Sequence, residues 1–165
     1  MRKLLTVIGI VTFLGFGTAV APSLAEPARP HHFGASLSGD QEVPSVDTRA
    51  RGHATFLLAP DGDTLHYRLV VGNLADVVQA HIHLAPAGQN GAVVAWLYPE
   101  GPPPQLIPGR SAGVLATGSI TADDLVGPLA GMDLDALVEA IEAGGAYVNV
   151  HTAAHPAGEI RGQIR

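Results

Sequence analysis

The sequence predicts an all-β domain, an antiparallel Greek-key sandwich or barrel of about eight strands with one inserted amphipathic helix near 133–143. Three observations predict this class. Apolar and polar residues alternate in short segments, turn residues separate these segments, and the period changes to that of a helix only once. A chain of 165 residues has room for one ordinary domain.

The predicted strands follow one another from residue 33 to the end of the sequence. We expect them at residues 33–38, 51–60, 64–71, 76–84, 92–98, 112–120, 146–151 and 158–165. Glycine-containing turns at 61–63 and 90–91 join neighbouring segments as hairpins. The segment 99–109 holds five prolines, so we expect a surface loop there.

The predicted helix is based on a change of period after residue 130. We expect Asp133 to cap its N-terminus and Gly144 to end it. Further upstream, Thr121 and Asp124 have the spacing of a capping box, which predicts a short helical turn. The apolar residues that recur at i, i+3, i+4 and i+7 are Leu134, Leu137, Val138 and Ile141.

The N-terminal segment is typical of a secretory signal peptide. Arg2 and Lys3 precede an apolar run to about residue 20, and small residues that a signal peptidase accepts follow. A retained membrane anchor is the alternative, but the run is short and glycines interrupt it. We therefore expect a signal peptide at 1–25, a flexible arm at 26–32 and a domain at 33–165, secreted or periplasmic.

Charge and composition exclude several kinds of function. The formal net charge is −6, and the predicted cleavage would remove Arg2 and Lys3 and make the protein more acidic. An acidic surface without basic runs argues against nucleic acid and anionic lipid as partners. The sequence has no cysteine, which excludes disulfides, thiolate metal sites, blue copper and a cysteine nucleophile. No other catalytic motif stands out, so we predict no catalytic residues and leave enzymatic activity open.

Two histidines share one face of the predicted strand 76–84. His81 and His83 alternate with apolar residues that must face the core, so both imidazoles stand on the outer side of the sheet. The predicted strand 146–151 repeats this pattern, with Val148 and Val150 inward and His151 outward. If the two strands are neighbours, the three imidazoles form one site on the outer face, roofed by the adjoining loops.

Neutral imidazoles without thiolate suit copper, zinc, nickel or iron. The sequence therefore predicts a metal site, with copper first and zinc second, formed by His81, His83 and His151. His155 is either a fourth ligand or a solvated loop residue. In the alternative interpretation, His81 and His83 bind loop carbonyls and no metal.

The remaining histidines and the polar residues of the last strand have secondary roles in this prediction. His53 and His66 lie opposite the apolar faces of their strands and are expected to be exposed. Glu159 or Gln163 could orient a ligand imidazole, with cross-strand charge pairing as the alternative, and Arg161 could attract an anion.

Four stretches occur in a characteristic order: LSGDQEVPSVDTRARGHATF, AHIHLAPAGQNGAVV, GSITADDLVGPL and AYVNVHTAAHPAGEIRGQI. Together they resemble the CHRD family, which is named after its repeats in chordin and also occurs singly in exported bacterial proteins. The resemblance covers Phe33 to Arg165. Because chordin is an extracellular binding protein, it implies an alternative function as a non-enzymatic interaction module that uses the outer face and the loop 99–109.

A more distant resemblance is to copper/zinc superoxide dismutase, a Greek-key barrel whose copper is held partly by an H-x-H strand. It implies copper at His81 and His83, a further ligand at His151, and copper redox activity as a third hypothesis. The sequence departs from that pattern because it has no second histidine cluster with an aspartate and no disulfide.

Overall fold

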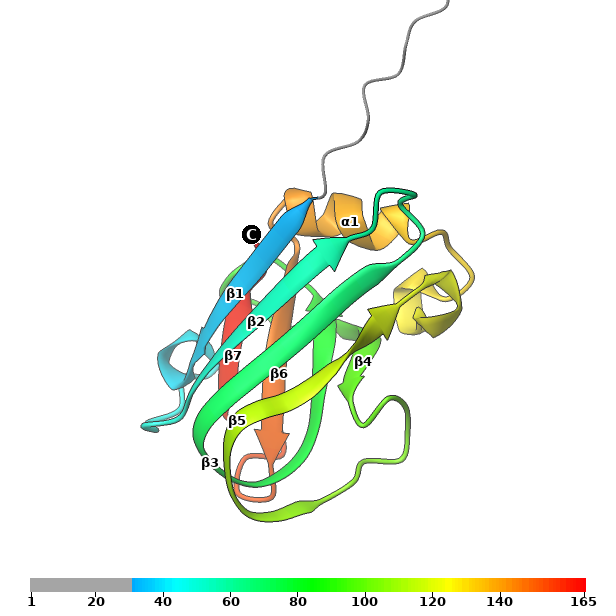
Figure 1. Cartoon of the computed structure of the whole chain (residues 1–165). Helices are drawn as coiled ribbons and strands as arrows, with labels where there is room; N and C mark the ends of the chain where they lie inside the picture. The colour runs from blue at the N-terminus through cyan, green and yellow to red at the C-terminus, as the bar shows by residue number, and fades with distance from the viewer. Residues whose placement is uncertain (1–30) are drawn as a thin grey trace, which may run out of the picture.

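The computed structural model describes residues 31–165, and these fold into seven antiparallel strands and one helix (Figure 1). The predicted signal peptide and all but the last two residues of the predicted arm lie outside the described residues. The all-β class is confirmed. The strands are β1 (His32–Ser38), β2 (Arg51–Leu58), β3 (Leu65–Leu84), β4 (Ala92–Tyr98), β5 (Ile107–Ile120), β6 (Ala146–Thr152) and β7 (Ile160–Gln163).

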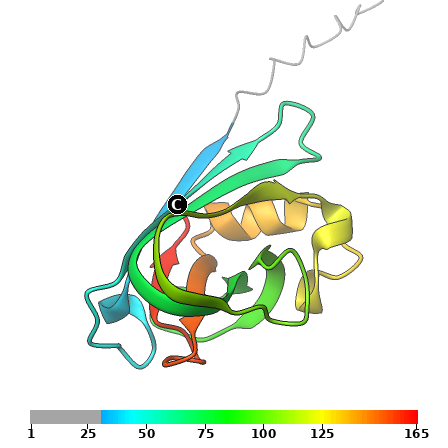
Figure 2. The ribbon, with the colours of Figure 1, turned by 60° about the horizontal axis from the view of Figure 1, so that its bottom comes forward.

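The strands form a closed ring because β3 takes part in it twice. Its first half, from Leu65 to Gly72, pairs with β2, and its second half, from Val77 to Leu84, pairs with β6. The ring continues from β2 through β1 and β7 to β6, while β5 flanks the first half of β3 and β4 flanks the second. Figure 2 shows the long β3 curving round the molecule from one side to the other.

The count of strands differs from the prediction because the expected strands 64–71 and 76–84 are one continuous strand. A bend replaces the expected break, at Asn73 and Asp76, whose φ angles are 59° and 53°. Asparagine and aspartate tolerate this left-handed conformation better than most residues. Strand β5 holds the bend in place, since the Gly109 N–H donates to Asp76 Oδ1 at 2.7 Å. For the same reason β5 begins at Ile107, inside the segment expected to be a loop.

The helix α1 (Asp135–Glu142) lies across one end of the strands and covers the core there (Figure 1). Its buried residues are Leu137, Val138 and Ile141, as the apolar period predicts. Asp133 is not its N-cap, because the Asp133 carbonyl accepts the Ala136 N–H in a preceding turn, and Leu134 takes the cap position.

The end of the helix and the turns before it agree better with the prediction. Gly144, with φ 68°, directly follows the last helical turn, as expected of a helix-terminating glycine. The 3-10 turn η2 (Ala122–Asp124) has the predicted capping box of Thr121 and Asp124. Two further 3-10 turns are η1 (Gly39–Gln41) and η3 (Gly127–Leu129). Within residues 31–165, no helix has the length and apolar character needed to cross a membrane.

Candidate metal centre

The outer face of the second half of β3 and of β6 carries the three histidines. In the register of these strands, His81 lies opposite Asn149, and His151 lies opposite Gln79. The alternate residues on both strands, such as Ile82 and Val148, are fully buried in the core. The predicted alternation is therefore confirmed, and the two strands are neighbours, which was the condition for a shared site.

The outer face is buried as well, because connections between strands cover it. The exposed fractions of His81, His83 and His151 are only 3%, 8% and 5%. The covering residues belong to three connections: 39–50 between β1 and β2, 85–91 between β3 and β4, and 153–159 between β6 and β7. The centre is thus an enclosed polar cluster between a sheet and its loops.

The three imidazoles are close enough to share one ion. One ring nitrogen from each histidine lies within 4.8 Å of the corresponding nitrogen of the other two. His81 Nδ1 and His151 Nε2 are 3.2 Å apart, so in the metal-free protein one of them donates a hydrogen bond to the other. Two imidazole nitrogens bound tetrahedrally to zinc at its usual bond length are separated by about 3.3 Å, so this pair already has the spacing of neighbouring ligands.

Backbone carbonyls orient two of the rings. His83 Nδ1 lies 2.9 Å from the Gly91 carbonyl oxygen, and His151 Nδ1 lies 3.0 Å from that of Pro156. A carbonyl only accepts, so in both neutral rings Nδ1 donates and the lone pair is on Nε2. This is the usual arrangement for a metal-binding histidine, in which the second nitrogen is held by an acceptor.

Glu159 and Gln163, which the sequence suggested as orienting groups, form their hydrogen bonds with other residues. Glu159 accepts hydrogen bonds from the hydroxyls of Thr48 and Thr152, at 2.8 and 2.7 Å. Gln163 donates to the carbonyls of Ala85 and Gly144. The orienting groups are therefore main-chain atoms, which no side-chain pattern in the sequence could have indicated.

Aromatic rings pack against the cluster and shield it from water. The ring of His83 stacks on Tyr147, with centroids 4.9 Å apart and planes 8° from parallel. The ring of His81 meets Trp96 edge to face, with centroids 4.3 Å apart. These contacts limit ring rotation, so the nitrogens hold their directions.

Burial keeps the rings neutral. Burial first, and then the neighbouring rings of His151 and His83, lower the pKa of His81 to about 3. Burial likewise lowers the pKa of His151 to about 4 and lowers that of His83. At neutral pH all three imidazoles are uncharged, which is the charge state that binds a metal ion.

The donor set has unpartnered atoms of the kind that a metal ion would engage. Within residues 31–165, four buried side-chain polar atoms have no hydrogen-bond partner: His81 Nε2, His83 Nε2, Asn149 Oδ1 and Glu42 Oε1. Such atoms are costly to bury unless something binds them. The Gly91 carbonyl accounts for Nδ1 of His83, and the Asn149 side chain is near enough to oppose the lowering of its pKa, but Nε2 has no hydrogen bond of its own. The residues present therefore fit a transition-metal ion.

The other histidines do not join this group. His155 is half-buried in the 153–159 connection and is not among the three that converge, so its role as a ligand stays a prediction. His53 and His66 are exposed, as predicted.

Sequence reasoning missed the importance of a buried ion pair beside the centre. Arg161 on β7 contacts Glu42 from the 39–50 connection, with Nη2 and Oε2 2.9 Å apart. Burial raises the pKa of Glu42, and the Arg161 charge opposes this effect. Nothing in the sequence singles out Glu42, because the irregular segment GDQEVPSVDT holds three acids and has no strand period.

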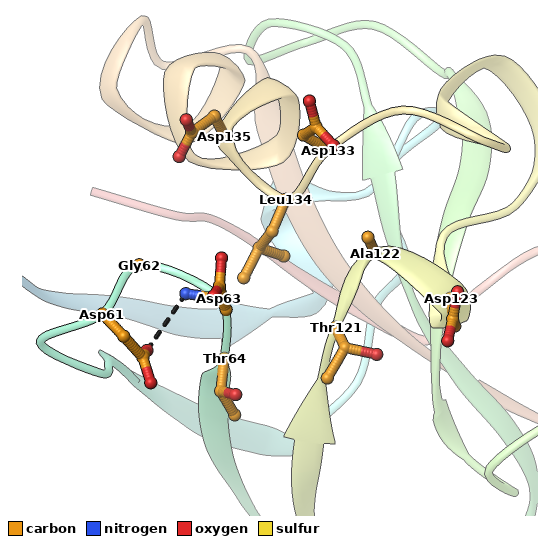
Figure 3. A pocket seen from close by; sticks show the side chains of 10 residues that line it. All are labelled: Asp61, Gly62, Asp63, Thr64, Thr121, Ala122, Asp123, Asp133, Leu134 and Asp135. Atoms are coloured by element: carbon orange, nitrogen blue, oxygen red, sulfur yellow. Dashed lines mark hydrogen bonds between the residues drawn. The ribbon is translucent and has the colours of Figure 1, made fainter.

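A separate pocket at another part of the molecule is lined mainly by acidic residues (Figure 3). Its carboxylates come from the β2–β3 turn, from η2 and from the start of α1, and they are spread around the rim rather than turned to one point. Within the part of the chain that the structure describes, only the three histidines form a group able to share an ion. The acidic residues are Asp61, Asp63, Asp123, Asp133 and Asp135.

Comparison with known proteins agrees with the resemblance seen in the sequence. The fold and the enclosed histidine cluster define an all-β domain with a candidate metal centre between its sheet and its loops. The family model described as CHRD domain matches residues 33–164, and the chain therefore belongs to the CHRD family. Neither a curated protein nor a solved structure matches the chain significantly.

Proposed function

We propose that this protein is an exported CHRD-domain protein that binds one transition-metal ion through His81, His83 and His151. The observation that carries the proposal is the convergence of three neutral, buried imidazoles, among which His83 Nε2 has no partner and His81 Nδ1 lies 3.2 Å from His151 Nε2. Export follows from the signal-like segment at 1–25, and the function would then be metal binding or buffering outside the cytoplasm.

Copper is the first choice of metal and zinc the second. Imidazole ligands bind both, and for a given site Cu(II) generally binds more tightly than Zn(II). Three protein nitrogens leave one coordination position free. A bound ion would therefore be able to bind water or a small ligand there. The protein's own residues hold the rings, exclude bulk water and keep the imidazoles unprotonated.

Metal content tests the proposal. The chain from Glu26 onward would be purified, stripped with a chelator and titrated with Cu(II) or Zn(II), and the bound metal would be measured by elemental analysis after gel filtration. We expect stoichiometric binding, lost in the double variant His81→Ala with His83→Ala. The matched control is His53→Ala with His66→Ala, which removes two exposed histidines and should bind as the unaltered protein does.

The competing function is an interaction module in which the histidines only support the loops. That function would be favoured if the unaltered protein bound no more metal than the His81 and His83 double variant while both stayed folded. An export assay with residues 1–25 fused to a reporter tests the localisation independently of the metal.

A further inference from the structure

Arg161 lies at the centre of a buried network on the outer face. It is 4% exposed and lies opposite Asn149 in the β6–β7 register. Its Nε donates to Glu42 Oε2 at 3.0 Å, and its Nη1 donates to the Gln89 carbonyl at 2.9 Å. Its Nη2 also donates to Asn90 Oδ1. The guanidinium thus joins β7 to two of the connections that cover the centre.

The bonds to Gln89 and Asn90 fix the carbonyl that orients His83. These two residues directly precede Gly91, whose carbonyl oxygen accepts the His83 Nδ1 proton. Gly91 is a close approach of the backbone to β3, because a Cβ there would lie 1.8 Å from the Leu84 carbonyl oxygen. Asn90 also donates to the Val43 carbonyl at 2.9 Å, which ties the loop to the connection that carries Glu42.

A second path from Arg161 to His83 goes through Tyr147. The Arg161 guanidinium carbon lies 4.1 Å from the Tyr147 ring centroid, in the geometry of a cation–π contact. The Tyr147 ring also stacks on the ring of His83. The Tyr147 hydroxyl accepts the Gly91 N–H at 3.2 Å, so both paths end at the same ring and the same glycine.

His151 provides an internal comparison. The carbonyl that orients it belongs to Pro156, in the connection between β6 and β7, and none of the hydrogen bonds of Arg161 goes to that connection. Glu42 itself packs against Gly158 of that connection, so a change at Arg161 alone, with Glu42 kept, should reach His83 and spare His151.

We propose that Arg161, paired with Glu42, is a positioning residue for the metal centre that holds the 85–91 loop and Tyr147 so that the Gly91 carbonyl fixes His83 with Nε2 directed at the ion. The part of this inference that concerns metal affinity rests on the proposed function. The part that concerns the His83 ring is a property of the metal-free protein.

The test uses the double variant Glu42→Met with Arg161→Met. It replaces the ion pair by apolar side chains of similar length, so no unpaired charge is left in the interior. In the metal-free protein, long-range nitrogen–proton NMR spectra of ¹⁵N-labelled histidines report the tautomer of each ring. We expect His83 and His151 to be protonated on Nδ1 in the unaltered protein. In the variant, His83 should become a mixture of tautomers. In Arg161→Lys, which leaves Glu42 against Gly158, His83 should change in the same way while His151 stays unchanged.

Metal binding provides a second measurement on the same double variant. The number of nitrogens coupled to Cu(II) in electron spin resonance should fall from three to two, and the affinity should fall about 10–100-fold, as for other groups that orient metal ligands. The control is Glu159→Gln, which alters a buried carboxylate on the same side of the molecule without touching the 85–91 loop. It should leave the His83 tautomer as it is.

The outcomes separate the two proposals. An unchanged His83 tautomer in the folded double variant overturns the positioning role, whatever the metal result. If the unaltered protein binds no metal, the proposed function fails, and the tautomer spectra still decide the role of Arg161. If the double variant does not fold, Arg161→Lys takes its place, because it keeps a charge for Glu42 but loses the forked geometry, and the same change at His83 is expected.

Discussion

The two halves of β3 have the same alternation and different surroundings. In the first half, His66 and Arg68 point outward and are exposed, while Leu69 points into the core. In the second half, His81 points outward in the same way but is buried, while Ile82 is buried in the core. The strand pattern decides which side a residue takes. The loops decide whether that side is solvent or an enclosed site.

This comparison explains why histidines of the same strand have different roles. His66 contacts the Ser119 hydroxyl at the surface, with 2.8 Å between Nδ1 and Oγ. His81 and His83 instead lie under the connections that Arg161 and Glu42 hold together. An enclosed cluster of neutral imidazoles is a property of the whole outer face, and no single strand could form it.

The largest difference in stability between the covered and the exposed outer face should appear when an arginine is removed from each of them. Arg161→Met leaves Glu42 buried without a partner, so we expect the free energy of unfolding to fall by about 3–5 kcal/mol. Arg68→Met, on the exposed face of the first half, should change it by no more than about 0.5 kcal/mol. Urea denaturation followed by circular dichroism measures both. Equal effects would mean that the loops do not isolate the outer face.

Substitutions on the inner face should lower the free energy of unfolding by similar amounts in the two halves of β3. Leu69→Ala and Ile82→Ala each open a cavity in the same core, so each should lower the free energy of unfolding by about 2–5 kcal/mol. The same denaturation experiment checks this. A small effect for one of them alone would show that the two halves do not share a core.

Acid should lower the free energy of unfolding through the buried histidines of β3 and β6. The folded-state pKa values of His81 and His151 are lowered to about 3 and about 4, chiefly by burial. Histidines in the unfolded chain take up protons near pH 6.5, so stability is complete above that pH and is lost as the pH falls toward the folded values. Each histidine should contribute up to about a tenfold change in the folding equilibrium per pH unit.

The measurement is a series of urea midpoints of the metal-free protein between neutral and acid pH. His151→Gln removes one of the titrating groups and should make this dependence shallower. If the urea midpoint of this variant fell with pH as steeply as that of the unaltered protein, His151 would not be a source of the acid sensitivity.

The smallest effect is expected for the exposed histidines. His53→Ala with His66→Ala should leave metal affinity unchanged and should alter the free energy of unfolding by no more than about 0.5 kcal/mol. Isothermal titration calorimetry and urea denaturation check the two quantities. A loss of metal binding in this variant would mean that the metal site lies near β2 and the first half of β3 instead.

The sequence predicted those features that depend on alternation. The core faces of β3 and β6 and the outward direction of His81, His83 and His151 follow directly from a period of two, whereas the pairing that brings the three together does not. The expected break between residues 71 and 76 was wrong, because left-handed residues can bend a strand without ending it. Asp133 was wrong as a cap for a similar reason, since several residues near a helix start can satisfy the same pattern.

The features that the sequence could not predict depend on contacts between distant segments. Gly91 and Pro156 orient rings with main-chain carbonyls, which every residue has, so their identity carries no signal. Glu42 is an acid in an aperiodic loop, and its burial depends on Arg161 lying more than a hundred residues away in the sequence. Only the folded chain shows that these groups meet.

The bend at Asn73 and Asp76 also sets the phase of everything that follows it in β3. An insertion or deletion of one residue there would exchange the two faces of the strand downstream. The imidazoles of His81 and His83 would then face the hydrophobic core, and Ile82 would face the loops. Evolution can therefore lengthen or shorten this segment only in steps of two, or with a compensating change before residue 81.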